Sequence, residues 1–551
     1  MPKPSLFLTT LVFALASQAL LAESPRLVLQ LTVDGLRADL IHRYRDNFGT
    51  GGFNYLLREG AVFSNARYLH ANTETIVGHT TLATGATPSV HGMVGNVWYN
   101  ASTGDLGYNI EDPEAPLLPT REHQVEGAQV DPAQLKAGSK GRSPRSILAP
   151  SFADTLNISG GKDSKVFGVS GKDRSAVAMA GHTGTAYWYS TDSGDFQTSA
   201  YYMDQYPEWV TRWNNERQAD ALAGKAWQLL LEQNDYLLAG QDDRPYEVDL
   251  KGYGKVFPHA FGPAEHPLFH TRVLVSPYGD SILADFAKNL MAAENIGQDA
   301  VTDYVSVSFS GVDAVNHFFG PSSLENEDTV IRLDRTLEDL LKYVDKHIGL
   351  NNTLVVLSAD HGMAEMPEHA AEKGLHTRRL YSDQVVEAAQ QLSLDKFGRD
   401  DLIKDFFRPY FYLDEKVITE ASLDLDDIAS KLAAGLEQIE GIRAAVPSAK
   451  AAEYSELAVA HNHHPERSGH IYLYPEPHWF FFDKGPIGVM HGSPWAYDQH
   501  VPLIFAGKGI EPGRTARPVN IIDVAPTLSA LLQLPPPAAA QGTALPEVFP
   551  R

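Results

Sequence analysis

The 551-residue sequence contains no cysteine. This excludes a disulfide framework, a thiol nucleophile and a metal site built on thiolates. After the N-terminal segment it also lacks any apolar run long enough to span a bilayer. Basic side chains are scarce, since 45 Lys and Arg face 69 Asp and Glu and the formal net charge is −24. Such a charge argues against stable binding to nucleic acid or an anionic membrane, but a local cluster of metals and cations could still bind an anionic substrate.

The N-terminus has the pattern of an export signal. Lys3 is followed by an apolar run at residues 6–21 and by the small residue Ala22. We therefore predict a signal peptide at 1–22 and a mature chain at 23–551 that is periplasmic or secreted, with no membrane contact after cleavage. The alternative, a retained membrane anchor, is disfavoured because the apolar run is short for a membrane span.

Three nearly continuous apolar runs, at 27–33, 304–309 and 353–358, each lead into a segment that carries an acidic residue. This pattern is typical of strands buried on both faces of a parallel sheet, whose ligand-binding loops lie at their carboxyl ends. Apolar residues at helical spacing over 330–348 predict a crossover helix, and 501–505 is a further strand candidate. The sequence thus predicts an α/β sandwich with a central, mostly parallel sheet.

Two stretches break this alternation of strands and helices. Residues from about 180 to 278 are rich in Tyr, Trp, Gly and Asp, and residues from about 366 to 488 contain short strands and an amphipathic helix near 428–439. We interpret both as insertions that fold as a cap over the ligand edge of a single catalytic domain at 23–551.

Acidic residues and histidines gather at the predicted strand ends. Asp34, Asp313 and Asp360 would lie along one edge if the three strands are neighbours. On a helical turn, Asp313 and His317 face the same way and can bind one metal ion, and the adjacent Asp360 and His361 can reach a common centre. Each Asp alone could be an N-cap or a turn residue.

His491 adds another imidazole before the last predicted strand. Oxygen and nitrogen donors without sulfur suit Zn²⁺ in open, catalytic coordination. The tract 461–464, His-Asn-His-His, is a rival metal cluster. We interpret that tract as a surface loop.

Thr75 places a hydroxyl before a segment that predicts the start of a helix, where free N–H groups and the helix dipole suit a phosphoryl anion. An N-cap is the alternative. Lys172 and Arg174 are two apart, so in an extended chain both would point to one site while Asp173 points away. A solvated surface pair is the alternative there. Asn96 could be a turn residue or could donate from its amide to a phosphoryl oxygen.

Together these residues resemble the alkaline phosphatase superfamily, and within it the bacterial phosphate-irrepressible alkaline phosphatases with a threonine nucleophile, which have a domain related to type I phosphodiesterases and nucleotide pyrophosphatases. The resemblance extends over about residues 27–530. One departure is Val77, where the pattern often has proline. The motifs that carry the resemblance are Asp34-Gly35, Thr75 with Gly78-His79, Thr87-Pro88 with His91-Gly92, Gly95-Asn96-Val97-Trp98, Ser143-Pro144-Arg145, Lys172-Asp173-Arg174, Ser310-Gly311-Val312-Asp313 with His317, Asp360-His361-Gly362, and His491-Gly492.

The resemblance implies a role for each site residue. Thr75 would be the nucleophile, and Asn96, Lys172 and Arg174 would bind the phosphoryl group. Two zinc ions would be bound, one by Asp313, His317 and His491. The other would be bound by Asp34, Asp360 and His361, with the Thr75 oxygen as a further ligand.

The sequence therefore predicts an exported, monomeric alkaline phosphatase that hydrolyses small phosphate monoesters through a phosphothreonine intermediate. A monoester dianion carries one more negative charge than a diester, so two basic side chains favour the monoester. A phosphodiesterase or nucleotide pyrophosphatase on the same scaffold is the alternative, and a non-enzymatic exported binding protein is a further one. A sulfatase is disfavoured because threonine cannot be oxidised to the aldehyde that such an enzyme needs.

Overall fold

The computed structural model describes residues 24–100, 103–121, 130–160, 163–454 and 458–549. The predicted signal peptide at 1–22 lies outside these ranges and stays a prediction. Within them, no helix combines the length and the apolar character needed to cross a membrane.

The centre of the molecule is a ten-stranded sheet in the order β21-β2-β20-β13-β1-β12-β7-β8-β9, with β22 paired to β2. At its middle, β1 (Leu27–Val33) pairs in parallel with β12 (Asp303–Phe309) and with β13 (Thr353–Ser358). Every residue of these three strands is buried, which confirms the predicted strands. The other strands are β2 (Ala61–Arg67), β7 (Val166–Ser170), β8 (Thr185–Tyr189), β9 (Phe196–Gln197), β20 (His500–Gly507), β21 (Gly513–Thr515) and β22 (Val519–Asn520).

The register of the central strands aligns their carboxyl ends. Val33 lies opposite Phe309 on one side, and Thr32 lies opposite Ser358 on the other. Because the strands are parallel, the segments that follow them leave the sheet at one edge. β7 is parallel to β12 and ends at the same edge, so the predicted neighbourhood of strand ends is present.

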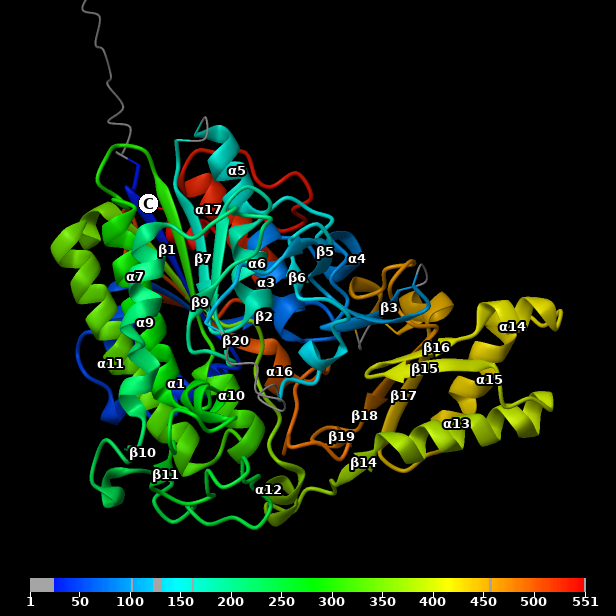
Figure 1. Ribbon diagram of the computed structural model, residues 1–551. Helices are drawn as coiled ribbons and strands as arrows, with labels where there is room; N and C mark the ends of the chain where they lie inside the picture. Colours follow the sequence, from blue (N-terminus) through cyan, green and yellow to red (C-terminus); the bar gives the residue numbers. More distant parts are fainter. Residues whose placement is uncertain (1–23, 101–102, 122–129, 161–162, 455–457, 550–551) are drawn as a thin grey trace, which may run out of the picture.

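Helices cover both faces of the sheet, and Figure 1 shows the resulting three layers. One group packs around α11 (Leu324–His347), the predicted crossover helix, with α9 (Pro277–Ala293) and α10 (Gly311–Phe319). The other group is α3 (Thr75–Thr84), α5 (Phe152–Ser159), α6 (Asp173–Ala180) and α17 (Val524–Leu531). The predicted α/β/α sandwich with a mostly parallel sheet is therefore confirmed.

The first predicted insertion, at about 180–278, begins too early. β8 and β9 lie inside that interval, yet they are strands of the main sheet. The aromatic run Tyr187-Trp188-Tyr189, part of the Tyr- and Trp-rich stretch, belongs to strand β8, and all three rings are buried. Later in the interval the chain is mostly irregular, with α7 (Glu208–Glu216), α8 (Phe269–Leu274) and a short pair of strands, β10 (Ala226–Trp227) and β11 (His259–Ala260).

The second interval contains a lobe, residues 379–482, that lies to one side of the main body (Figure 1). Its own four-stranded antiparallel sheet has the order β15-β16-β18-β17, and its buried side chains form a separate apolar cluster. The predicted amphipathic helix is α15 (Leu425–Leu436). The other elements are β14 (Arg379–Tyr381), α13 (Ser382–Phe397), β15 (Ile403–Phe407), β16 (Tyr410–Leu413), α14 (Glu415–Glu420), β17 (Ile442–Pro447), β18 (Ile471–Pro475) and β19 (Phe480–Phe482). The division into one catalytic domain with insertions stays a prediction.

A third irregular region, which the sequence did not predict, precedes β7. It contains two short antiparallel pairs, β3 (Val97–Asn100) with β4 (Asp105–Tyr108) and β5 (Glu111–Pro116) with β6 (Gly141–Arg142). The remaining short helices of the described chain are α1 (Ala38–Arg43), α2 (Phe53–Glu59), α4 (Pro88–His91), α12 (Pro367–Glu372) and α16 (Ala496–Gln499).

Candidate active site

The carboxyl edge of the central strands gathers two groups of acidic and histidine side chains. One group is Asp313, His317 and His491, and the other is Asp34, Asp360 and His361. In each group the ligand atoms lie within 4.8 Å of one another. Across the described ranges, no third group of His, Asp and Glu meets this criterion.

A tight turn after β1 brings the two groups together. Gly35 has φ +72°, and its N–H donates to Asp360 Oδ1 at 3.2 Å. A Cβ atom at this position would lie 2.9 Å from the Cβ of Asp313. Only glycine combines this backbone conformation with such a close approach, so the turn fixes the separation of the strand-end acids.

Main-chain carbonyls orient the three imidazoles. Nδ1 lies 2.9 Å from the Val489 carbonyl in His317, 2.8 Å from the Gly362 carbonyl in His361 and 2.7 Å from the Thr73 carbonyl in His491. A carbonyl only accepts, so each Nδ1 carries a proton and Nε2 is the nitrogen left to bind a ligand. Orientation of this kind is common for metal-binding histidines.

The carboxylates are buried, and several of their oxygens accept no hydrogen bond. These are both oxygens of Asp34, Oδ1 of Asp313 and Oδ2 of Asp360, among the described residues. Asp34 Oδ2 and Asp360 Oδ2 instead form ion pairs, with Lys172 and His79 respectively. Burial alone would lower the pKa of His361, but Asp360 and Asp34 raise it to about 10. The site therefore holds more negative charge than its own side chains neutralise. This orphaned set of oxygen and nitrogen donors fits metal cations.

Thr75 is the first residue of α3 and is fully buried. The N-cap position belongs to Glu74, so the alternative interpretation of Thr75 as an N-cap is wrong. The helix approaches the end of β13 at Gly78, where a Cβ would lie 2.0 Å from the Asp360 carbonyl oxygen. His79 lies 2.8 Å from the Thr75 carbonyl and 3.1 Å from Asp360 Oδ2.

The predicted geometry of the cation pair is wrong. Lys172 has an extended backbone at the N-cap position of α6, and Arg174 lies in the first turn of that helix. Asp173, predicted to point away from the site, lines the same cavity. It is buried, accepts from the Tyr108 hydroxyl at 2.5 Å and pairs with Arg142 at 2.8 Å. The helix begins two residues earlier than an extended Lys-Asp-Arg segment allows.

Both cations nevertheless reach the candidate site. Lys172 Nζ lies 2.7 Å from Asp34 Oδ2 and also pairs with Asp313, so it bridges the two acidic groups. Arg174 Nη2 lies 3.4 Å from Thr75 Oγ1, and its Nη1 pairs with Asp131 at 2.6 Å.

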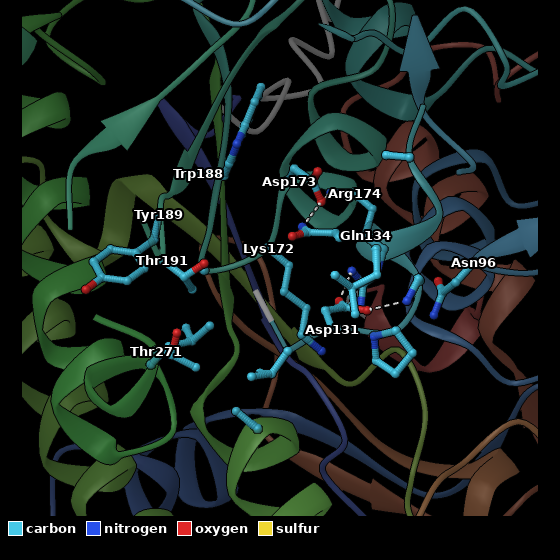
Figure 2. A pocket seen from close by; sticks show the side chains of 18 of the residues that line it. Asn96, Asp131, Gln134, Lys172, Asp173, Arg174, Trp188, Tyr189, Thr191 and Thr271 are labelled. Carbon is cyan, nitrogen blue, oxygen red and sulfur yellow. Dashed lines mark hydrogen bonds and ion pairs between the residues drawn. The ribbon is translucent and has the colours of Figure 1, made fainter. Parts of the chain in front are cut away.

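A cavity of about 540 Å³ is lined by Lys172, Arg174 and Asp131. Figure 2 shows Lys172 and Arg174 between two sides of the cavity, with Asn96 on one side and Trp188 and Tyr189 on the other. Asp313, His317 and His491 also line the cavity, whereas Asp34, Asp360, His361 and Thr75 are fully buried and do not line it. The cavity therefore opens on the first ligand group and on the cations.

Sequence reasoning missed several charged residues that line this cavity, among them Glu74, Asp131 and Arg408. Glu74 directly precedes Thr75 but had no assigned role. Asp131 and Arg408 come from the irregular region before β7 and from the lobe, and no local pattern marks them. The tract 461–464 is not a metal cluster by the criterion above. In that tract Asn462 is buried and its Oδ1 accepts from the Asn72 N–H at 2.9 Å.

The α/β/α sandwich with these two ligand groups at one sheet edge defines a protein of the alkaline phosphatase superfamily, which confirms the resemblance. The chain belongs to the type I phosphodiesterase / nucleotide pyrophosphatase family, which matches residues 28–494.

Relatives match nearly the whole chain. A protein of Myroides odoratus named calcium-transporting ATPase is 33% identical, over 97% of this chain and 96% of its own. Alkaline phosphatase PafA of Elizabethkingia meningoseptica is 32% identical, over 96% of this chain and 95% of its own. The crystal structure of wild-type PafA has a TM-score of 0.88 and covers 96% of this chain and 99% of its own. A second solved structure is a PafA variant substituted at a threonine, an asparagine, a lysine and an arginine.

Proposed function

We propose that this protein is an exported alkaline phosphatase that hydrolyses phosphate monoesters at a two-zinc site. The observation that carries the proposal is the pair of metal-ligand groups that Lys172 bridges, with Arg174 Nη2 3.4 Å from Thr75 Oγ1. The names of PafA and of other relatives, alkaline phosphatases at 27–32% identity, support the same activity.

The two ligand groups would each hold one metal ion. Asp313, His317 and His491 would bind one ion, and Asp34, Asp360 and His361 would bind the other, with Thr75 Oγ1 as a further ligand. When bound, such ions lower the pKa of a nucleophilic hydroxyl and stabilise the oxygen of the leaving group. Zinc is the proposed metal because the donors are carboxylates and imidazoles without sulfur.

The chain's own residues would then carry out an in-line displacement. Thr75 Oγ1 forms a bond to phosphorus as the bond to the ester oxygen breaks, which releases the alcohol and leaves phosphothreonine. Water attacks this intermediate, releases phosphate and restores the hydroxyl. The Asn96 amide, the Lys172 ammonium, the Arg174 guanidinium and the N-terminal N–H groups of α3 would stabilise the non-bridging oxygens, where positioning and electrostatics supply most of the catalysis.

Two basic side chains at the cavity favour a monoester over a diester, because the monoester dianion carries one more charge to neutralise. The PafA variant is changed at the same four residue types, in the same order, as Thr75, Asn96, Lys172 and Arg174. Its threonine and asparagine, and its lysine and arginine, are also separated by the same intervals as in this chain. This correspondence supports the four assigned roles. A phosphodiesterase or nucleotide pyrophosphatase remains the alternative on this scaffold.

Export through the predicted signal peptide, a periplasmic or secreted location, a monomeric state and the absence of a stable nucleic-acid partner are parts of the proposal. The net charge of −24 supports the last of these.

The function is tested by removing metal from the purified protein with a chelator and then adding Zn²⁺ or Mg²⁺. Hydrolysis of 4-nitrophenyl phosphate and of bis(4-nitrophenyl) phosphate is measured in each state. We expect activity to disappear with the metal and to return with zinc, with the monoester as the better substrate. Full recovery with Mg²⁺ alone would refute the zinc assignment, and a better diester rate would establish the alternative.

A further inference from the structure

Glu74 is a buried carboxylate beside the proposed nucleophile, and the mechanism above does not use it. Its side chain lines the cavity although the residue is only 3% exposed. It occupies the N-cap position of α3, yet its side chain accepts no capping hydrogen bond. Among the described residues it forms no ion pair, and a buried charge without a pair costs free energy.

One hydrogen bond that Glu74 accepts comes from the phosphoryl-binding segment, in addition to a side-chain hydrogen bond with Asn72. Glu74 Oε2 lies 2.5 Å from the backbone nitrogen of Asn96, whose N–H it accepts. The chain passes close to this carboxylate, because a Cβ on Gly95 would lie 3.1 Å from Oε2. This hydrogen bond to the carboxylate thus fixes the position of the Asn96 main chain.

Two further atoms of Asn96, the side-chain oxygen and the main-chain carbonyl oxygen, also form hydrogen bonds. Its Oδ1 accepts from the Ile76 N–H at 3.2 Å, and its carbonyl accepts from the Asn109 side chain at 2.7 Å. The Asn96 amide nitrogen donates to no described residue, and Asn96 lines the cavity (Figure 2). The use of Oδ1 by Ile76 determines which end of the amide is left to donate to a ligand.

The two contacts to Asn96 come from residues on either side of Thr75. Glu74 holds the main chain of Asn96, and Ile76 holds its amide oxygen. The positions of the nucleophilic oxygen and of the amide donor are therefore both set by the same three consecutive residues at the start of α3. A displacement of about 1 Å in such a donor is enough to lose much of its effect on a transition state.

We infer that Glu74 is a positioning residue that sets the place of the Asn96 amide relative to Thr75 Oγ1. The inference rests on the proposed function, since it assumes that Asn96 binds the phosphoryl group. Glu74 belongs to neither of the two metal-ligand groups. Its effect on turnover is transmitted through Asn96.

A double-mutant cycle tests this inference. The variants are Glu74→Ala, Asn96→Ala, the double variant, and Glu74→Gln, which keeps an oxygen acceptor of the same shape. We expect Glu74→Ala to lower kcat/KM for 4-nitrophenyl phosphate about tenfold and to weaken competitive inhibition by inorganic phosphate, as a misplaced donor would. Glu74→Gln should recover most of the loss. The double variant should be within about twofold of Asn96→Ala, because both changes remove one interaction.

Asp303→Ala is the matched control. Asp303 is also buried and its carboxylate also accepts from the backbone, here from the N–H groups of Lys165 and Gly297, but it is the first residue of β12, at the end away from the candidate site. Its loss should lower the melting temperature and leave kcat/KM and the phosphate inhibition constant of the folded protein unchanged.

Additive losses in the double variant, or a Glu74→Ala profile equal to that of Asp303→Ala, would overturn the positioning role. An unimpaired Asn96→Ala variant would overturn it as well. If the wild-type protein with zinc hydrolysed no monoester, the proposed function itself would be wrong, so the two failures are distinguishable.

Discussion

Carbonyl groups of the main chain, rather than other side chains, orient the three imidazoles of the site. His317, His361 and His491 each donate from Nδ1 to a backbone oxygen. Backbone acceptors cannot be lost by mutation of a neighbouring side chain, so this orientation depends on the loops and not on a second layer of residues. The carboxylates, by contrast, depend on the side chains of Lys172 and His361 for charge balance.

At the nucleophile, Thr75→Ala should lower monoester turnover by a factor of about 10³ or more, because the covalent intermediate can no longer form. The bound metal, measured by plasma emission spectroscopy, should stay near the wild-type amount because six other ligands remain. Near-normal turnover would show that Thr75 is not the nucleophile.

At the cations, replacing Lys172 and Arg174 together by Ala should reduce monoester turnover by about 10²-fold or more and diester turnover much less. The physical reason is the extra charge of the monoester dianion. The ratio of the two kcat/KM values is the readout. An equal loss on both substrates would mean that the pair does not sense the substrate's charge.

Helix α3 and strand β13 meet at Gly78, and this contact determines how far Thr75 lies from Asp360. A Cβ at Gly78 would lie 2.0 Å from the Asp360 carbonyl oxygen and 2.9 Å from its Cα. Both are main-chain atoms, which cannot move aside as the end of a flexible side chain can.

Gly78→Ala should therefore separate the helix from the strand end. We expect a stability loss of about 1–3 kcal/mol, as for other overpacked interiors, together with a clear loss of kcat. Gly107→Ala is the control, since nothing lies within 4 Å of a Cβ at that position of β4. Thermal unfolding and monoester kinetics check both variants, and equal behaviour of the two would contradict the close contact.

The molecule also contains buried acidic side chains outside the candidate active site. Glu325 of α11 is fully buried, and Glu247 lies in the irregular region before α8. Burial, together with the charge of Glu325, raises the pKa of Glu247 to about 10. The folded state therefore binds this proton more tightly than the unfolded chain does. Its contribution to stability is complete below the ordinary pKa of a glutamate and is lost as the pH rises through about 10.

Glu247→Gln removes this pH dependence. We expect the melting temperature of the wild type to fall more than that of the variant between about pH 6 and pH 10, by a few degrees. Glu114→Gln is the control, because that side chain is 83% exposed. Parallel melting curves for wild type and Glu247→Gln across this range would contradict a protonated Glu247.

Local sequence patterns were enough to predict the core of the sheet and the ligand residues that lie close together in the chain. The apolar runs before Asp34, Asp313 and Asp360 identify buried parallel strands because both faces of such strands must be apolar. The spacing of Asp313 and His317 follows from the helical turn, and the two side chains lie 3.2 Å apart on α10. The helix start at Thr75 was also predictable from the sequence.

Tertiary structure alone decided what the site contains beyond those motifs. The order β13-β1-β12-β7 brings together strand ends that are hundreds of residues apart, and no local pattern encodes that order. Two predictions, an extended segment at Lys172–Arg174 and an insertion that starts at about residue 180, were wrong because they depended on local sequence alone. Packing against the sheet chose helix α6 and strand β8 where local sequence also allowed a loop. Glu74 and Asp131 gain their partners, Asn96 and Arg174, only through these long-range contacts, because a hydrogen bond depends on position in space and not on distance along the chain.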